Sequence, residues 1–403
     1  MEQMLPSRWK TFKLDKLGSV SRGRSRHRPR NDSSLYGGEY PFFQTGDVKA
    51  ANLYLSEYSQ TYNEIGLAQS KQWEAGTLCI TIAANIAETA ILGIRGCFPD
   101  SVIGYICDPV KADTRFIKYY IDLIKRDMQQ VSHGTTQDNL SLDKLLHFNF
   151  VVPNVNEQRK IAGILSAYDD LIENNLRRIK ILEEMAQNLY REWFVKFRFP
   201  GHQNTRFVDS PLGKIPEGWE VHLVEKIVIR IHSGKKYNQK TASATGAIPI
   251  LDQGRSGIIG YHDDEPGVLA SEDRPIIVFA NHTCYQNLIM YPFSAIQNVL
   301  PFIANSKYLR DIYWLHYTTK DLVTFNDYKG HWPEFISKEL ILPISYVCKN
   351  FGSIVEPILR LIFRHEKRNT NLRQTRDLLL PKLISGEVDV SELEIAIPEE
   401  AIA

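Results

Sequence analysis

The sequence lacks the patterns that mark secreted, disulfide-bonded and membrane-spanning proteins. Its five cysteines are scattered over 403 residues without a CxxC spacing, which is typical of reduced, mostly buried thiols. The N-terminus is polar and does not resemble a signal peptide. No apolar run approaches the roughly 18 residues that a membrane span requires. These absences predict a cytoplasmic protein without a membrane segment.

Catalytic motifs are also missing. The chain has no GxxxxGK[ST] loop, no HExxH and no zinc-type spacing of cysteine and histidine. It has no Asp/Asn-Pro-Pro-aromatic tetrapeptide and no glycine-rich cofactor loop after a first strand, so no adenine methyltransferase site is visible. Asp100 follows Pro99, but nothing downstream completes a nuclease cluster. We therefore expect a binding protein with no catalytic residues, no metal ligands and no bound cofactor.

A general excess of positive charge is absent as well, because the net charge is only +1. The charge is nevertheless unevenly distributed. Residues 21–30 hold five arginines and no acid, whereas residues 387–400 hold six acids and no base. A nearly neutral chain of this kind can still present a basic face to nucleic acid.

What the sequence does contain is a long amphipathic segment at residues 157–199. Its apolar residues recur every three or four positions, which predicts a helix, and the later ones approach a heptad pattern. About 37 helical residues would give a rod of roughly 55 Å. A rod of that length favours a spacer between two domains. The stripe consists of Ile161, Ile164, Leu165, Tyr168, Leu171, Ile172, Leu176, Ile179, Leu182, Leu189 and Trp193.

This helical segment occurs twice. Pro343 follows Pro153 by 343 − 153 = 190 residues, and the same offset places Leu361 on Leu171 without any gap. Because internal repetition sets the architecture, we expect a duplicated unit of one domain and one helix. Pro357 falls inside the second copy, where a proline costs about 3 kcal/mol. We therefore expect a kink there, or a helix that begins near it.

The globular regions before each helix are also related. Trp219 matches Trp9 at an offset of 210, and residues 277–281 match residues 81–85. The second globular region is therefore 210 − 190 = 20 residues shorter than the first. Short β-branched runs alternate with helical segments in both regions, which predicts mixed α/β domains. The predicted division is 1–153 (first domain), 154–199 (first helix), 200–343 (second domain, opening with a linker rich in proline and glycine), 344–387 (second helix) and 388–403 (a frayed acidic tail).

Four motifs carry a resemblance to a known family. They are Asn156-Glu-Gln-Arg-Lys-Ile-Ala, Leu189-Tyr-Arg-Glu-Trp-Phe, Pro211-Leu-Gly-Lys-Ile-Pro-Glu-Gly-Trp and Leu378-Leu-Leu-Pro-Lys-Leu-Ile-Ser-Gly-Glu-Val. Together with the duplicated layout, they make the whole chain resemble the specificity subunit of type I restriction–modification systems. The motifs are informative about the family and carry no information about the DNA target.

The resemblance implies an α+β fold in which two target-recognition domains are separated by two long antiparallel coiled-coil helices with pseudo-twofold symmetry. Each domain would read one half of a split sequence in double-stranded DNA, and the helices would set the spacer. Two methyltransferase subunits would clasp the helices and use S-adenosylmethionine, and an ATP- and Mg-dependent restriction subunit could join. The assembled complex would be an adenine-N6 DNA methyltransferase and ATP-dependent endonuclease, whereas this chain itself would not catalyse.

Polar loops at matching points of the two repeats are the candidate DNA contacts. Arginine and lysine suit phosphates and guanine, and glutamine or asparagine suits adenine. The alternatives are a solvated basic loop and ordinary turn chemistry around Gly46 and Gly254. The candidates are Arg22, Arg24, Arg26, Arg28 (with Arg30 in the same run), Gln44, Thr45, Asp47, Asn85, Thr135, Thr136, Gln137, Lys235, Lys236, Tyr237, Asp252, Gln253, Arg255, Asn281, His282, Lys329 and His331.

The apolar stripe is wider than a plain two-helix pair needs, so partner helices are expected to cover its outer positions. Trp193 and Phe194 would mark the partner-facing end, and their alternative is to cap the second domain. The candidate subunit contacts are Leu171, Leu182, Leu189, Trp193, Phe194, Leu361, Leu372 and Leu379. A rival hypothesis is a coiled-coil scaffold whose globular domains bind proteins rather than DNA. A self-sufficient enzyme is disfavoured by the missing motifs.

Overall fold

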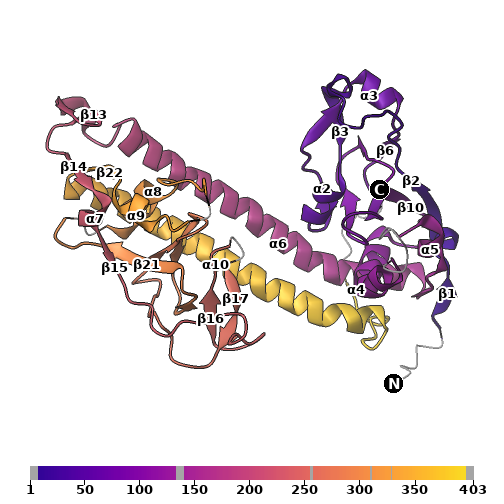
Figure 1. Ribbon diagram of the computed structural model, residues 1–403. Helices are drawn as coiled ribbons and strands as arrows, with labels where there is room; N and C mark the ends of the chain where they lie inside the picture. Colours follow the sequence, from indigo (N-terminus) through magenta and orange to yellow (C-terminus); the bar gives the residue numbers. More distant parts are fainter. Residues whose placement is uncertain (1–7, 133–139, 255–256, 309–310, 328, 396–403) are drawn as a thin grey trace. The chain divides into compact units, whose positions relative to one another are not determined.

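The computed structural model (Figure 1) describes residues 8–132, 140–254, 257–308, 311–327 and 329–395. It contains two compact units: unit 1 comprises residues 1–176 and 368–403, and unit 2 comprises residues 177–367. Each unit combines one globular lobe with segments of two long helices, α6 (Val155–Tyr190) and α10 (Ser345–Ile384). The division predicted from the sequence separates helices from lobes, and it stays a prediction.

The first lobe, in unit 1, is built on a five-stranded sheet of order β2-β10-β7-β8-β4, with β4 parallel to β8 and the other pairs antiparallel. A second sheet has the order β5-β3-β9-β6, and β1 pairs with β11. The elements are β1 Lys10–Phe12, α1 Leu14–Leu17, β2 Gly18–Arg22, η1 Ser33–Leu35, β3 Tyr36–Phe42, α2 Thr45–Ala50, β4 Tyr54–Leu55, β5 Gln60–Tyr62, α3 Glu64–Ala68, β6 Gln72–Trp73, β7 Leu78–Thr81, β8 Thr89–Leu92, β9 Gly96–Cys97, β10 Val102–Cys107, α4 Thr114–Ser132, α5 Leu142–His147 and β11 Phe150–Val152.

The second lobe, in unit 2, repeats this plan. Its main sheet has the order β15-β21-β18-β19, the counterpart of β2-β10-β7-β8, and β14 pairs with β22 as β1 pairs with β11. In the smaller sheet β16 is antiparallel to β17 and parallel to β20, as β3 is to β5 and β9. The elements are η3 His202–Asn204, β12 Phe207–Ser210, β13 Gly213–Pro216, β14 Glu220–Leu223, α7 Val224–Ile227, β15 Val228–Arg230, β16 Ile248–Leu251, β17 Ile258–His262, β18 Ile276–Ala280, β19 Gln286–Ile289, β20 Ser294–Ala295, β21 Val299–Ala304, α8 Ile312–Thr319, α9 Trp332–Ile336 and β22 Glu339–Leu342.

Within each unit α6 and α10 pack together in antiparallel fashion. In unit 1, Asp169 and Asn175 of α6 contact Arg376 and Asn369 of α10, so the residue numbers rise on one helix as they fall on the other. Both helices also contribute to the core of each lobe. The core of unit 1 includes Ile161, Ala162 and Leu165 of α6 and Leu383 and Ile384 of α10, and that of unit 2 includes Ala186 of α6 and Val347, Phe351 and Val355 of α10.

The second long helix does not begin near Pro357, because α10 is continuous from Ser345 to Ile384, and the kink stays a prediction. A proline at this position leaves the carbonyl of Ser353 without its helical N–H partner. Both Ser353 and Pro357 are exposed, so water can satisfy that carbonyl. The adjacent Val355 is fully buried in the core of unit 2, and this packing holds the helix together on its other face.

Two further segments are more ordered than the sequence suggests. The linker predicted after Phe199 contains a hairpin, β12–β13, and both Phe199 and Ile215 are buried. The first part of the acidic tail is also packed: Val390 is fully buried, and Asp389 accepts a hydrogen bond of 2.6 Å from Arg8. The tail is therefore not frayed in its described part, which ends at residue 395.

The core of unit 2 contains a buried histidine, His316 on α8. Its main-chain carbonyl accepts a hydrogen bond of 2.8 Å from the side chain of Gln286 on β19. Burial is the main cause that lowers the pKa of His316 from 6.5 to about 3, so the folded protein holds a neutral imidazole. The unfolded chain binds a proton below pH 6.5 that the folded chain does not bind, and stability must fall as the pH drops from 6.5 towards 3.

We predict that acidification from pH 7.5 to 5.0 lowers the free energy of unfolding of the protein by about 2 kcal/mol more than that of the His316→Leu variant. The loss begins at the unfolded pKa of 6.5, and the remaining 6.5 − 5.0 = 1.5 units correspond to about that amount. Denaturant unfolding at the two pH values measures this difference. Asp311, whose pKa burial raises to about 6, acts in the opposite direction but is present in both proteins. Equal pH dependence of the two proteins would contradict the prediction.

Candidate nucleic-acid interface

The basic loop between β2 and η1 uses some of its arginines to hold its own backbone. Arg24 donates two hydrogen bonds to the carbonyl oxygen of Ser70, one of them at 2.8 Å, and Arg28 donates to the carbonyl oxygen of Ser25 at 2.7 Å. Arg30 donates to both carboxylate oxygens of Asp100, at 2.6 and 2.9 Å. These three side chains stabilise the loop through hydrogen bonds within the protein, a role that the sequence did not reveal.

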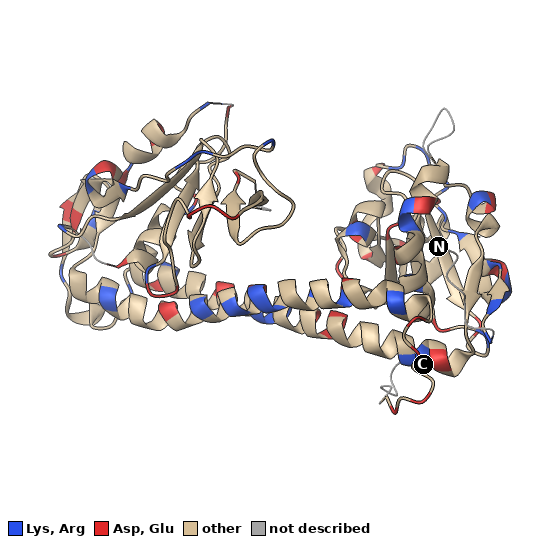
Figure 2. Ribbon diagram, turned by 90° about the horizontal axis from the view of Figure 1, so that it is seen from below, with Lys and Arg blue, Asp and Glu red and all other residues tan. Residues whose placement is uncertain are grey.

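Arg22 and Arg26 differ from their neighbours in the same loop. Both are exposed, and neither side chain has a hydrogen-bond or ion-pair partner within the part of the chain that the structure describes. Figure 2, with lysine and arginine in blue, shows basic residues on the loops of the lobes as well as along both helices. Arg22 and Arg26 are thus the members of this run that remain available for phosphate contacts.

We predict that Arg26→Ala makes the DNA association constant of the assembled complex less dependent on salt. The slope of its logarithm against the logarithm of the salt concentration should become less steep by about one unit, because each neutralised phosphate contributes roughly that much. Base preference should not change, since a phosphate contact carries no sequence information. Fluorescence anisotropy over a salt series measures the slope. Arg26→Lys, which keeps the charge, is the matched control. An unaltered slope in Arg26→Ala would exclude the contact.

The α2 region of unit 1 brings together several predicted residues. Asp47 accepts a hydrogen bond from the backbone N–H of Gln44 at 2.7 Å, so it caps α2, and Thr45 is half-buried in the first turn. The side chain of Gln44 is exposed and donates to Gln60 at 2.8 Å. Turn chemistry therefore accounts for Asp47, whereas Gln44 stays a candidate base contact.

Asn85 lies beside α2 in the loop after β7. Lys49 of α2 donates to the side-chain oxygen of Asn85 at 3.3 Å, and the loop holds Ala84 and Ala87 at positive φ of 62° and 59°. Positive φ at a residue with a Cβ is uncommon and marks a constrained loop. The sequence reasoning missed Lys49, which adds an exposed cation to this region. The predicted residues Thr135, Thr136 and Gln137 lie outside the described residues.

The lysines of the corresponding loop of unit 2 already have partners. Lys235 pairs with Asp264 at 2.8 Å, and Lys236 donates to Ser233. Tyr237 is buried, donates to Asp264 at 2.9 Å and stacks on His262 with ring centroids 4.2 Å apart. The hydrogen bonds from Lys235 and Tyr237 lower the pKa of Asp264. Tyr237 is therefore a structural residue, and Lys235 reaches DNA only by leaving Asp264.

Three segments of unit 2 that are distant in sequence meet in one cluster. The side-chain oxygen of Gln253 accepts from the N–H of His282 at 2.9 Å, and the carbonyl oxygen of Gln253 accepts from Thr283 at 2.6 Å. His282 Nδ1 lies 2.9 Å from the carbonyl oxygen of Lys329. The structure thus unites the predicted Gln253, His282 and Lys329, and it adds Thr283, which the sequence reasoning missed. Arg255 lies outside the described residues.

Other predicted members of this cluster have structural roles. Asp252 accepts from the N–H of Gly254 at 3.0 Å, which is turn chemistry. Asn281 accepts from the N–H of Trp332 at 2.8 Å. His331 is fully buried, and its Nε2 lies 3.0 Å from the carbonyl oxygen of Asp327. His331 therefore does not present its side chain to DNA, and that part of the prediction is corrected.

The predicted match of Asn281 to Asn85 also needs a correction. Tyr105 and Phe302 are the fourth residues of the equivalent strands β10 and β21. Tyr105 pairs with Leu78 and Phe302 pairs with Ile277, so the strand register aligns Ile277 with Leu78. The sequence match had aligned Ile277 with Thr81. The loop after β7 has seven residues (82–88) and the loop after β18 has five (281–285). The two asparagines therefore share a loop but not a position.

The predicted subunit contacts on the helices divide into two groups. Trp193 and Phe194 are buried in the core of unit 2, so they cap the second lobe, and their prediction as partner contacts is wrong. Leu189 and Leu379 pack partly against the lobe cores, and Leu182 and Leu372 are half-buried. The repeat-related pair Leu171 and Leu361 is exposed by 52% and 43%, and these two remain available to a partner.

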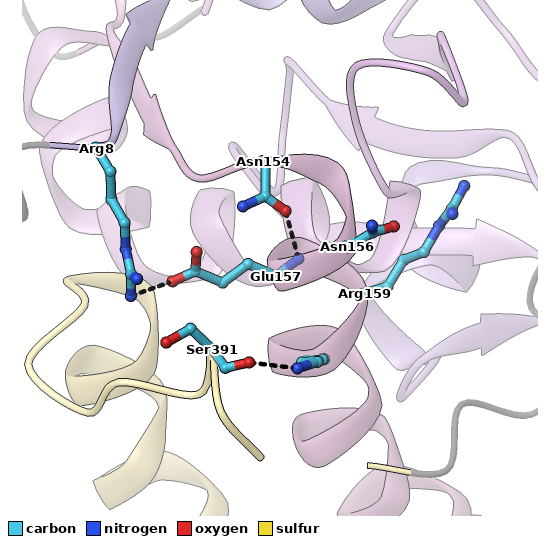
Figure 3. Close-up of a pocket in the computed structure, with 7 residues that line it drawn as sticks. Arg8, Asn154, Asn156, Glu157, Arg159 and Ser391 are labelled. Carbon is cyan, nitrogen blue, oxygen red and sulfur yellow. Dashed lines mark hydrogen bonds and ion pairs between the residues drawn. The ribbon is translucent and has the colours of Figure 1, made fainter. Parts of the chain in front are cut away.

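A pocket at the start of α6 (Figure 3) has a volume of about 500 Å³. Arg8 donates to Glu157 at 3.3 Å, and Lys160 donates to the carbonyl oxygen of Ser391 at 2.6 Å. The pocket is therefore the polar junction of three segments of unit 1. Its lining is Arg8, Asn154, Asn156, Glu157, Arg159, Lys160 and Ser391.

No group of three or more histidine, cysteine, aspartate or glutamate side chains among the described residues is arranged to hold a metal ion. No described helix combines the length and the apolar character needed to cross a membrane.

Comparison with known proteins finds similarity to one family. Residues 6–184 match the type I restriction modification DNA specificity domain. The chain is 25% identical over 427 residues to the type I restriction enzyme MjaIX specificity subunit of Methanocaldococcus jannaschii, covering 96% of this chain and 95% of that protein. Over 69% of its length it is also 23% identical to the putative type I specificity subunit S.MgeORF438P of Mycoplasma genitalium, of which 72% is covered.

The fold comparison agrees with this result. The crystal structure of the type I restriction–modification S subunit from M. genitalium superimposes with a TM-score of 0.60 at 16% identity, covering 95% of this chain and 97% of that one. Residues 6–184 thus carry the DNA specificity domain of type I restriction–modification systems, and nearly the whole chain is similar to specificity subunits of these systems. The predicted resemblance to this family and the predicted fold class are confirmed.

Proposed function

We propose that each lobe reads one half of a bipartite DNA target and that α6 and α10 set the number of unread base pairs between the halves. The observation that carries this proposal is the duplicated strand order, β2-β10-β7-β8 in unit 1 and β15-β21-β18-β19 in unit 2. The loops after the equivalent strands β7 and β18 carry different side chains, Asn85 in one unit and His282 and Thr283 in the other. The segments that contact these loops also differ, with Lys49 of α2 in unit 1 and Gln253 after β16 in unit 2. Two related frames with different loops suit the reading of two different sequences.

We further propose that two methyltransferase subunits dock on the helices and that a restriction subunit can join them. The exposed, repeat-related Leu171 and Leu361 support this, because a duplicated apolar position fits two copies of one partner. In this proposal the partner subunits use S-adenosylmethionine, Mg and ATP, and the assembly is cytoplasmic. The alternative, a scaffold whose lobes bind proteins, has no specific observation in its favour.

Methylome sequencing of a host that expresses this chain with its methyltransferase subunits tests the proposal. The expected result is methylation at one bipartite motif with a constant spacer. Gln253→Ala should relax only the half read by unit 2, whereas Gln44→Ala should relax only the other half, by roughly 1–3 kcal/mol of discrimination in each case. A contiguous motif, or loss of specificity in both halves from either substitution, would contradict it. Absence of any salt-dependent shift of duplex DNA by the assembled complex would favour the scaffold.

A further inference from the structure

Two buried polar pairs join α6 to α10 in unit 1. Asn175 donates a hydrogen bond of 2.8 Å to the side-chain oxygen of Asn369. Asp169 accepts from the guanidinium of Arg376 and, at 2.5 Å, from the hydroxyl of Tyr119 on α4. Asp169, Asn175 and Asn369 are exposed by only 2%, 4% and 1%. Buried polar groups in a helix interface carry a desolvation cost that is compensated only when they find each other.

The repeat does not conserve these pairs. The offset of 190 residues relates Asp169 to Leu359 (169 + 190) and Arg376 to Ala186 (376 − 190). It also relates Asn369 to Ile179 (369 − 190) and Asn175 to His365 (175 + 190). At three of the four related positions unit 2 therefore has an apolar residue. The polar groups thus distinguish one helix from the other, although the two helices share a common pattern.

We propose that Asp169–Arg376 and Asn175–Asn369 are specificity determinants of helix pairing: they select the α6–α10 pair over the pairing of like helices from two copies of the chain. In an α6–α6 pair of the same geometry, each Asp169 would face Ala186 and each Asn175 would face Ile179 of the other copy. Each Asp169 carboxylate would then lose its ion pair with Arg376 and keep only the hydroxyl of Tyr119, and two amides would be buried without partners. In the equivalent α10–α10 pair, each Arg376 would face Leu359. A single buried asparagine pair is known to specify helix partners in this way.

The same two pairs also select one register. They are separated by six residues on α6 (169 to 175) and by seven on α10 (369 to 376). Sliding α10 by one heptad in one direction would bring Ile362 to Asn175. Sliding it in the other direction would bring Leu383 to Asp169. Either slide buries one polar group against an apolar side chain, so only the observed register satisfies both pairs.

Cysteine probes on the full chain test this inference. In the observed pair, position 176 lies opposite position 368, because 176 + 368 equals 175 + 369. If two α6 helices from different copies paired in the same antiparallel geometry, residue 177 of one would lie opposite residue 177 of the other. Position 176 of one copy would then lie beside position 176 of the other copy. Leu176→Cys alone therefore reports like pairing between two copies through a short bis-maleimide. Leu176→Cys combined with Arg368→Cys reports the native pair within one chain. The chain without an added cysteine controls for its five native thiols.

The test variant replaces all four polar residues, with Asp169→Leu, Asn175→Ile, Asn369→Ile and Arg376→Leu. We expect cross-linking between copies to rise about tenfold over the otherwise unchanged chain, the factor that corresponds to about 1.4 kcal/mol. The native cross-link within one chain should fall correspondingly. An unchanged monomer with an undiminished native cross-link would overturn the proposal. Lys180→Ala, at an exposed position of α6, is the matched control and should behave as the parent chain.

A charge exchange keeps the test decisive if the fourfold variant does not fold. Asp169→Arg alone places two arginines opposite each other and should increase cross-linking between copies. Adding Arg376→Asp restores an ion pair in reversed order and should return cross-linking to within about twofold of the parent chain, as in a double-mutant cycle. If the double exchange is no better than the single one, the pairing role is refuted. The readout involves no DNA, so it is independent of the proposed reading of the two half-sites.

Discussion

Replacing Phe194 with alanine is expected to lower the free energy of unfolding by about 3–5 kcal/mol, the usual cost of removing a buried phenylalanine. Phe194 is exposed by only 8%, and its ring centroid lies 5.0 Å from that of Phe351, 5.9 Å from Trp219 and 6.2 Å from Trp314. Phe351 lies on α10, Trp219 directly precedes β14, and Trp314 lies on α8. The alanine variant would leave a cavity where these three elements meet, and the loss of edge-to-face contacts adds to the effect.

Leu171→Ala is the matched control for Phe194→Ala. Leu171 lies on α6, whereas Phe194 lies in the π-helical turn Arg191–Val195 that follows α6. Both residues were predicted to contact a partner, but 52% of Leu171 is exposed. Its replacement should change the free energy of unfolding by less than about 1 kcal/mol and should instead weaken association with the proposed methyltransferase partner. Chemical denaturation followed by far-UV circular dichroism measures the first effect, and sedimentation with the partner measures the second. If Phe194→Ala left stability unchanged and weakened only association, the assignment of Phe194 to the core would be wrong.

The contrast between these two residues shows where sequence reasoning succeeds. The periodicity of α6 and the gapless offset of 190 predict both helices and the duplication, because burial of a stripe imposes a 3.6-residue repeat that is visible without coordinates. Periodicity states that a residue is apolar and on one face. It does not state whether a domain core or a partner covers that face, so Phe194 and Leu171 looked alike.

The loop residues show a second limit. Asp47 and Asp252 were predicted as base contacts, yet the first caps α2 and the second closes a turn. Aspartate next to glycine suits both roles, and the choice depends on the local backbone angles, which the sequence does not determine. Gln253, His282 and Lys329 were predicted separately, but their meeting in one cluster depends on strand pairing over long sequence separations.

Lengthening both helices by one turn is expected to lengthen the spacer of the recognised DNA without altering either half-site. The change duplicates residues 178–181 of α6 and residues 363–366 of α10. These segments lie opposite each other, because 178 + 366 and 181 + 363 equal the sum 175 + 369 of the observed pair. Both duplications lie outside the polar pairs of unit 1, so the pairing of the helices should be retained.

The size of the effect follows from helix and DNA geometry. Four residues add about 6 Å and rotate the following segment by about 40°. One base pair adds about 3.4 Å and rotates the duplex by about 34°. The added rotation of the helix is close to that of one base pair, and the added length is close to that of two. We therefore expect the spacer to grow by one or two base pairs. Methylome sequencing measures the spacer directly.

A four-residue insertion between Pro211 and Leu212, in the exposed turn of the β12–β13 hairpin, is the matched control. It adds the same length to the chain outside the helices and should leave the spacer unchanged. Altered half-sites with a constant spacer in the double duplication would show that the helices do not determine the spacing. The helices determine the spacing only if length added to both of them, and not length added elsewhere, increases the number of base pairs between the half-sites.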